Sequence, residues 1–142
     1  LAPWRFVVAA GAAQERLAGK AHARMTARGE DEAAAEKAAR AFREGALVVA
    51  VIAAPKPSPK IPAWEQELSA GAVCYGLLLA ALAAGWGANW LTRPLARDGA
   101  FLADALGCAE GEFVAGFVHV GRETAIPPER PRPDLAEHVA WL

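Results

Sequence analysis

The chain has 142 residues, of which 54% are hydrophobic and 22% charged, and its formal net charge at pH 7 is −1. This size and composition predict one folded globular domain with a substantial core and exclude a disordered chain. The near-neutral balance, without a basic excess, also argues against nucleic acid as the main partner.

The two cysteines, Cys74 and Cys108, are typical of reduced core thiols in a cytoplasmic protein and not of a disulfide framework or a metal site. The first residues lead directly into a predicted strand, so no secretory signal is expected. The chain begins with Leu1 and not with methionine, which leaves open that a leading segment of the protein precedes it.

Strands and helices alternate along the chain. The predicted elements are a strand over 5–10, helices over 13–24 and about 30–43, a strand over 47–53, a long helix from 62, a strand over 89–92, a helix over 97–106, a strand over 113–120 and a last helical turn over 134–142. The apolar run 47–53 is expected to be buried on both faces. The alanine-rich segment 30–43, acidic at its start and basic at its end, is expected to be a mobile surface helix without a site. This order favours an α/β or α+β fold with a small sheet.

The long helix dominates the sequence. Pro62 and the nearby Glu65 and Glu67 are typical of a helix start, and no residue from 70 to 84 is charged. A helix that is apolar all round is buried in protein or lies in lipid. Small residues recur at every fourth position and form a ridge for close packing, namely Ala72, Gly76, Ala80 and Ala84.

A membrane span is the alternative for this segment, because residues 70–90 approach the ~20 apolar residues that a span needs. The glycines at 85 and 87 and the amide of Asn89 argue against it. Burial in protein is therefore favoured.

No group of residues indicates a protein-based catalyst or a metal site. The histidines, His22, His119 and His138, do not adjoin a cysteine or serine in a recognisable catalytic motif. His119 lies between two valines and is interpreted as a sheet-face residue. We therefore expect no catalytic residue and no metal ligand.

The Gly85-Trp86-Gly87 stretch resembles half of a dinucleotide fingerprint, but it follows a helix instead of preceding one. A classical NAD-binding fold is therefore rejected. An apolar, aromatic and glycine-rich corner suits a cofactor that brings its own reactivity, and a plain helix–strand junction is the alternative.

Residues 64–71 (WEQELSAG) and their continuation through Gly85–Trp90 resemble the nitroreductase family, in particular its small bacterial NAD(P)H nitroreductase branch. Residues 3–8, 37–38, 47–53 and 114–117, with Gly121, support the likeness, which covers nearly all 142 residues in the right order.

The resemblance implies an α+β nitroreductase-like sandwich, in which helices flank a small central β-sheet and one long helix is buried at a subunit interface. It further implies a cytoplasmic homodimer that binds FMN at that interface and contacts neither membrane nor nucleic acid. Such an enzyme transfers electrons from its co-substrate NAD(P)H to a nitroaromatic or quinone-type acceptor by a ping-pong mechanism. The alternative is a degenerate homodimeric protein on the same scaffold that is flavin-free or binds another small ligand.

The family motifs also imply cofactor-binding residues. Trp90, Leu91 and Thr92 match the Trp-Arg-Ser contacts to FMN, with Leu91 in place of the arginine; Arg93 is a candidate substitute for the phosphate contact. The segment associated with NAD(P) matches Ala80, Ala81, Leu82, Ala83, Ala84 and Gly85.

The largest departure from the family is at the start. The family's N-terminal helices, with an Arg-Arg-Ser motif for the FMN phosphate and a histidine lent by the partner subunit, have no counterpart here. If the molecule begins at Leu1, strong FMN binding is not expected. We expect one domain over 1–142, with 122–142 as a C-terminal extension whose proline-rich arm wraps the partner subunit.

Overall fold

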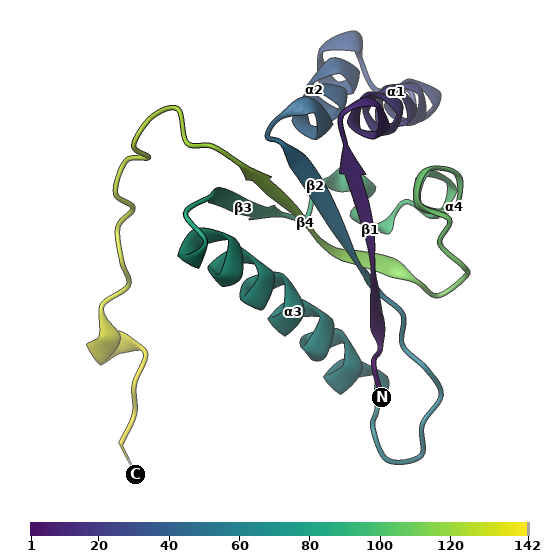
Figure 1. The fold of residues 1–142 in the computed structure, drawn as a ribbon. Coiled ribbons are helices and arrows are strands. Elements are labelled where there is room, and N and C mark those ends of the chain that lie inside the picture. The colour runs from purple at the N-terminus through teal and green to yellow at the C-terminus, as the bar shows by residue number, and fades with distance from the viewer. Residues whose placement is uncertain (142) are drawn as a thin grey trace.

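The computed structural model describes residues 1–141 and shows an antiparallel sheet between two unequal layers of helix (Figure 1). The sheet has the strand order β1-β2-β4-β3, with β1 at Trp4–Ala10, β2 at Leu47–Ala53, β3 at Gly87–Leu91 and β4 at Phe113–Gly121. The helices are α1 (Ala12–Ala27), α2 (Glu32–Arg43), α3 (Ala63–Ala83) and α4 (Gly99–Leu106), with 3-10 turns at Pro94–Arg97 and Leu135–Glu137. Leu142, the end of the predicted last turn, lies outside the described residues.

β2 is buried on both faces, as its continuous apolar run predicts. Val48, Ala50 and Ile52 face the larger core, which also contains side chains of α1, α2 and α4. Val49 and Val51 face the other way, toward Cys74 of α3. The alternation follows from the two-residue period of a strand, and it divides the molecule into α1, α2 and α4 on one face and α3 on the other.

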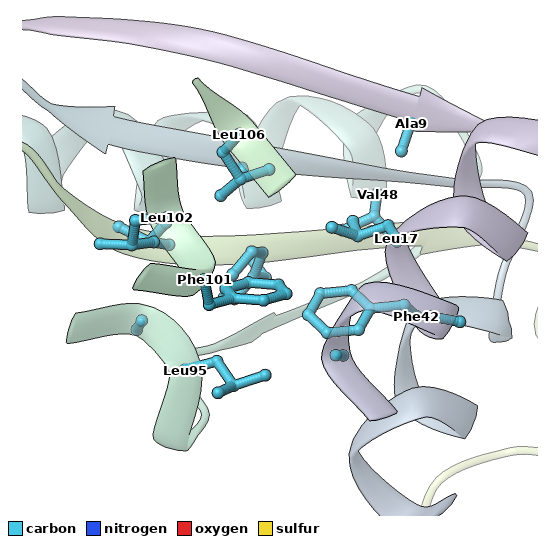
Figure 2. Packing of buried hydrophobic residues seen from close by; sticks show 14 of the residues in the cluster. Ala9, Leu17, Phe42, Val48, Leu95, Phe101, Leu102 and Leu106 are labelled. Carbon is cyan, nitrogen blue, oxygen red and sulfur yellow. The ribbon is translucent and has the colours of Figure 1, made fainter. Parts of the chain in front are cut away.

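Helix α2 is part of the core, so the expectation of a mobile surface helix is wrong. Ala35 and Ala39 are fully buried, and their small side chains let α2 approach α1 closely. Phe42 carries the aromatic contacts of the helix: its ring lies beside that of Phe101 (Figure 2), with centroids 6.1 Å apart. Its centroid also lies 5.1 Å from that of Phe117. The alanines therefore form a packing surface, which their mild hydrophobicity concealed.

Capping side chains set two helix starts that the sequence pattern placed differently. Asp31 accepts a hydrogen bond from the backbone N–H of Ala34 at 2.8 Å, so α2 begins two residues after the predicted position 30. Asp98 accepts one from the backbone N–H of Phe101 at 2.9 Å and starts α4. The predicted helix 97–106 is therefore a 3-10 turn followed by α4.

The single chain leaves most of α3 exposed, and its predicted burial at a subunit interface stays a prediction. Of its side chains only Gln66, Ala70 and Cys74 are buried within the described residues, all on the stripe that faces the sheet. The small sheet covers that stripe alone, and the described chain offers no second layer on the far side (Figure 1). By length and composition α3 is also the one described helix that could cross a membrane.

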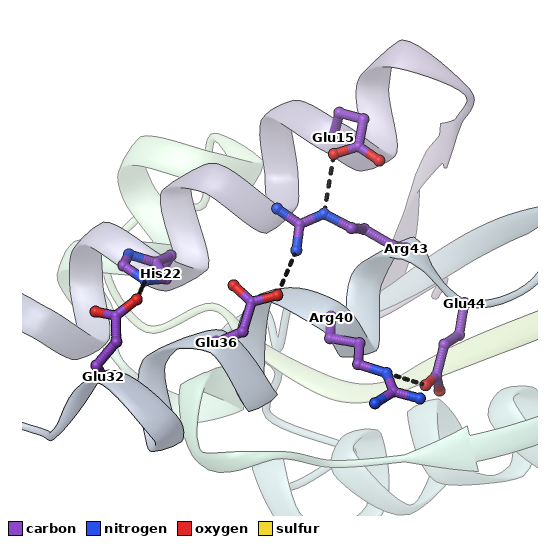
Figure 3. Close-up of polar contacts among 7 residues, drawn as sticks. All are labelled: Glu15, His22, Glu32, Glu36, Arg40, Arg43 and Glu44. Atoms are coloured by element: carbon purple, nitrogen blue, oxygen red, sulfur yellow. Dashed lines mark hydrogen bonds and ion pairs between the residues drawn. The ribbon is translucent and has the colours of Figure 1, made fainter.

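Several ion pairs lie on the solvent side of the α1–α2 hairpin. Arg43 joins α2 to Glu15 of α1 at 2.9 Å, and His22 of α1 lies 3.0 Å from Glu32 (Figure 3). These exposed pairs contribute little stability individually. They satisfy one another, which marks this face as a solvated surface and not as a site.

Candidate functional site

The C-terminal end of α3 turns sharply into β3, and this turn sets the position of most of the predicted site residues. The backbone N–H of Trp86 donates to the carbonyl oxygen of Ala81 at 3.0 Å, and that of Gly85 donates to Leu82 at 3.0 Å. This is the Schellman arrangement, and Gly85 holds the positive φ of 82° that it needs. The last carbonyls of α3 are thereby satisfied within the backbone.

β3 distributes its side chains between the two faces of the sheet. The indole N–H of Trp90 donates to the carbonyl oxygen of Ala115 at 3.3 Å, on the α3 side. Leu91 takes the opposite face, because neighbouring strand residues alternate. Thr92 follows the strand and is exposed.

Two adjacent cavities border this corner. The first, of about 640 Å³, is lined by Leu82, Ala84 and Gly85 together with Trp86, Gly87, Arg122 and Glu123. The second, of about 610 Å³, shares Gly87, Arg122 and Glu123 and includes Leu91 in its wall.

The structure thus brings part of the predicted NAD(P) segment and one predicted FMN residue to neighbouring cavities. Other predicted residues do not line either one, namely Ala80, Ala81, Ala83, Trp90 and Thr92. Sequence reasoning missed the arginines of the C-terminal tail, because nothing in a proline-rich arm indicates where it lies.

The second cavity has arginines on its tail side. Arg122, Arg130 and Arg132 line it together with Glu44, Glu123 and Glu129, and Arg132 pairs with Glu129 at 2.7 Å. Arg122 also lies 5.9 Å from the centroid of the Trp86 ring, within range of a cation–π contact. The wall therefore offers arginine donors to an anionic group beside an apolar, aromatic corner.

Arg93 has a strained backbone. Its φ of 50° and ψ of 157° lie in a region that glycine strongly favours. Within residues 1–141, Arg93 is the only residue other than glycine with a positive φ. Such a conformation costs about 1–3 kcal/mol. Pro94 accounts for the extended ψ, because proline disfavours helical ψ in the preceding residue. The sequence signalled this restriction through Pro94 but not the sign of φ.

The guanidinium of Arg93 also lacks a partner. Its Nε atom is buried without a hydrogen bond, and burial lowers the pKa of Arg93. The side chain turns to the α2 side of the sheet, where it lines a third cavity away from the first two.

His119 is a buried sheet-face residue of β4, in agreement with the sequence interpretation. Its ring centroid lies 6.4 Å from that of Phe42, and its Nε2 atom is buried without a hydrogen-bond partner. Burial lowers the pKa of His119, and the nearby positive charge of Arg93 acts in the same direction. His119 is therefore held in its neutral form.

Neither cysteine has the environment of a reactive thiol. Burial raises the pKa of Cys74 to about 11 and also raises that of Cys108, and a high pKa keeps a thiol protonated and unreactive. No cluster of three or more histidine, cysteine, aspartate or glutamate side chains with metal-binding geometry occurs within residues 1–141.

Comparison with known proteins identifies the fold and the family. The model of the "Nitroreductase family" matches residues 1–122. The chain is 34% identical to "Putative NAD(P)H nitroreductase YdjA" of Escherichia coli K12 over 119 residues, which cover 84% of this chain and 64% of that protein. It thus spans slightly less than two thirds of the length of this relative.

Solved structures give the same result for the fold. A nitroreductase-like family protein from Bacillus cereus superposes with a TM-score of 0.79 at 17% identity, over 99% of this chain and 73% of that one. The FMN and NADPH-dependent nitroreductase NfnB of Sphigopyxis sp. strain HMH superposes with a TM-score of 0.70 at 16% identity, over 99% and 80% of the two chains. The chain belongs to the nitroreductase family, with its α+β fold, and the predicted family resemblance is confirmed.

Proposed function

We propose that this protein is an FMN-dependent oxidoreductase that transfers electrons from NAD(P)H to a small aromatic acceptor, a nitroaromatic or a quinone, by a ping-pong mechanism. Family membership supports the reaction class. The names of two relatives support the co-substrates, since YdjA is named for NAD(P)H and NfnB for FMN and NADPH. We also propose a cytoplasmic location.

The observation that carries the proposal is the pair of adjoining cavities at the end of α3. Their volumes, about 640 and 610 Å³, lie within the range of cofactor sites. They meet at Gly87, so that two ligands bound there would be neighbours. This suits a reaction in which electrons pass between bound molecules.

The residues present fit FMN at the second cavity. The arginines of its tail side are suitable partners for a phosphate, because guanidinium forms bidentate, charge-assisted hydrogen bonds with it. Leu91 and the aromatic corner provide apolar contacts for a ring system. FMN, when bound, supplies the redox chemistry itself.

The protein's part in this reaction is to bind, orient and exclude water. Trp90 is held against β4 by its hydrogen bond to Ala115, so it fixes the position of β3 at the cavity edge. No protein nucleophile is required, which agrees with the thiol of Cys74 being held protonated.

We further propose a homodimer that pairs through α3. Its large exposed side chains form one stripe, with Trp64, Leu68 and Tyr75 each more than half exposed in the single chain. The small-residue ridge at Ala72, Gly76 and Ala80 is exposed as well. A second copy would cover both, which would complete the burial that the single chain lacks.

The test of the proposed function is a visible absorption spectrum of the purified protein with added FMN, followed by steady-state kinetics. We expect flavin bands near ~450 nm that stay with the protein, since the cofactor brings its own chromophore. NAD(P)H oxidation should require the acceptor. Double-reciprocal plots of rate against NAD(P)H concentration at several acceptor concentrations should give parallel lines, as a ping-pong mechanism requires. If the protein retains no flavin and oxidises no NAD(P)H, the alternative is favoured, namely a flavin-free binding protein on this scaffold. The apolar Leu91 in the cavity wall is compatible with that alternative.

A further inference from the structure

Arg93 lines a partly open cavity of about 370 Å³ between the α1–α2 hairpin and the 3-10 turn that follows β3. Its apolar walls include Met25, Phe42 and Leu95, and its charged groups are Glu30, Lys37 and Arg93. None of these residues lines the two cavities assigned to the proposed redox site. The cavity is therefore a separate feature of the molecule, on the opposite side of the sheet from α3.

The charges around this cavity do not balance. Among residues 1–141, no hydrogen bond or ion pair involves the guanidinium of Arg93 or the ammonium of Lys37. The one acidic side chain in its wall, Glu30, lies 3.9 Å from Arg28 and is partly neutralised there. Glu44 lies outside the wall and acts on Arg93 without forming an ion pair with it, while it pairs with Arg40 at 3.5 Å. The cavity thus has an excess of positive charge.

The position of Arg93 makes this excess significant. A buried polar atom needs a partner, and the Nε atom of the half-buried Arg93 has none. The same residue keeps a backbone conformation that a glycine would adopt without strain. Backbone strain of this kind is concentrated at active sites and ligand-binding positions. An anion in the cavity would supply the missing partner.

We propose that this cavity binds the carboxylate or phosphate group of a small molecule, with Arg93 as its main donor and Lys37 as a second cation. The rest of the ligand lies against Phe42, Met25 and Leu95. Guanidinium matches both anions because its N–H groups form a planar fork. The volume limits the buried part of the ligand to about one aromatic ring with its acidic group.

The anionic group has two sources, a free organic acid or the phosphate of a nucleotide bound in addition to the FMN proposed at the second cavity. Benzoate is the probe for the first source, because it joins a carboxylate to one aromatic ring. FMN and riboflavin together test the second, since they differ by the phosphate alone.

The experiment is a titration of the ¹⁵N-labelled protein with benzoate, followed by amide chemical shifts. We expect saturable shifts at Lys37, Ala38 and Arg93. In Arg93→Gly the affinity should fall at least tenfold, while glycine at φ 50° keeps the fold. The matched control is Arg16→Gln, which removes one positive charge from the exposed face of α1 and should bind as the unaltered protein does.

A second variant tests the cavity without changing charge. Ala38→Leu fills the wall beside Lys37 and should weaken benzoate at least tenfold with a native spectrum. The proposal is overturned if the unaltered protein gives no saturable shifts, if Arg93→Gly binds equally well, or if Ala38→Leu leaves the affinity unchanged.

Competition identifies the source of the anion. Displacement of benzoate by FMN but not by riboflavin supports the site with a nucleotide phosphate as its occupant. Displacement by neither supports it with a free acid as its occupant. Benzoate is followed by amide shifts and flavin retention by absorbance, so failure of the proposed redox function and failure of this site are distinguishable.

Discussion

The indole ring of Trp90 lies across the α-carbon of Gly116 on the neighbouring strand. A β-carbon built on Gly116 would overlap Nε1 and Cδ1 of that ring and would come within 3.0 Å of the Cys74 sulfur. The same indole donates its N–H to the carbonyl oxygen of Ala115. A missing side chain on β4 therefore makes the place for the aromatic residue of β3 at the edge of the candidate site.

Substitution of Gly116 by alanine should destabilise the protein because it forces Trp90 out of this position. Overpacking of this kind costs about 1–3 kcal/mol in the free energy of unfolding, measured by urea denaturation. Gly19→Ala on α1 is the control: nothing lies within 4 Å of its added carbon, and alanine in a helix should be neutral or stabilising.

A double-mutant cycle separates this clash from other effects of the methyl group. In a Trp90→Ala background the indole is absent, so Gly116→Ala should cost clearly less than in the unaltered protein. An equal cost in both backgrounds would show that the indole is not what the methyl group meets.

Phe42 tests whether α2 belongs to the core. Its side chain is 1% exposed and contacts Phe101 and Phe117. Phe42→Ala should lower the free energy of unfolding by about 3–5 kcal/mol, through lost burial and the cavity that remains. Phe6→Ala is the matched control, because Phe6 is 47% exposed on the edge strand β1 and should cost much less. Equal effects of the two changes would contradict the core assignment.

The order of the elements could be predicted because it depends on local patterns. The side chains from Leu47 to Ala53 alternate between two buried faces, as the apolar run indicates. Helix α3 ends just before its glycines, as the sequence pattern also indicates. Packing was harder to predict. The buried alanines of α2 resemble those of an exposed helix, since alanine is common in both settings, and only the surrounding helices distinguish them.

The candidate site could be predicted only in part, because some of its residues are placed by local turns and others by tertiary packing. Leu91 and Gly85 border cavities because the helix-to-strand turn, which the sequence shows, places them there. The positive φ of Arg93 depends on how the chain leaves β3 to enter the following 3-10 turn, which is a tertiary property. The exposure of α3 has the same origin: its composition requires cover, but a single chain need not supply that cover.

Asp98 makes stability depend on pH. The hydrogen bond from Arg24, at 2.7 Å, lowers the pKa of Asp98, and the backbone N–H of Phe101 acts in the same direction. A carboxyl group whose pKa is lowered by folding stabilises the protein above its unfolded value and loses this contribution as pH falls. The contribution of Asp98 should therefore be present at neutral pH and disappear as pH falls below about 3.8.

Asp98→Asn isolates this charge, because asparagine still caps α4. We expect a loss of about 1–3 kcal/mol at pH 7 and a smaller dependence of the free energy of unfolding on pH in acid. Asp104→Asn is the control: Asp104 pairs with Lys20 on the surface, and its exposed pair should contribute about 0–1 kcal/mol. An unchanged acid limb in Asp98→Asn would refute the assignment.

The C-terminal arm should affect assembly and not folding. Residues 122–140 contribute nothing to the buried core, and Ile126 is 94% exposed. Deletion of residues 126–142 should therefore leave the melting temperature nearly unchanged while it shifts the equilibrium from dimer toward monomer. The measurement is sedimentation equilibrium, and an unchanged equilibrium would mean that the arm does not wrap a partner subunit.

Gly76, on the exposed ridge of α3, allows the dimer itself to be tested. Nothing lies within 4 Å of a β-carbon built there, and position 76 is exposed, so a leucine side chain can extend into solvent on the single chain. A close-packed second helix has no room for that side chain. Gly76→Leu should therefore keep the native fold and weaken the dimer about tenfold or more, equivalent to about 1.4 kcal/mol.

The comparison is Gly19→Leu, which also replaces a helical glycine with open space around it but lies on α1, away from the proposed interface. Light scattering should give the unaltered protein and Gly19→Leu about twice the chain mass of 14.9 kDa, and Gly76→Leu a mass that falls toward one chain on dilution. A dimer in all three would place the interface elsewhere, and a monomer in all three would exclude a stable homodimer of this chain.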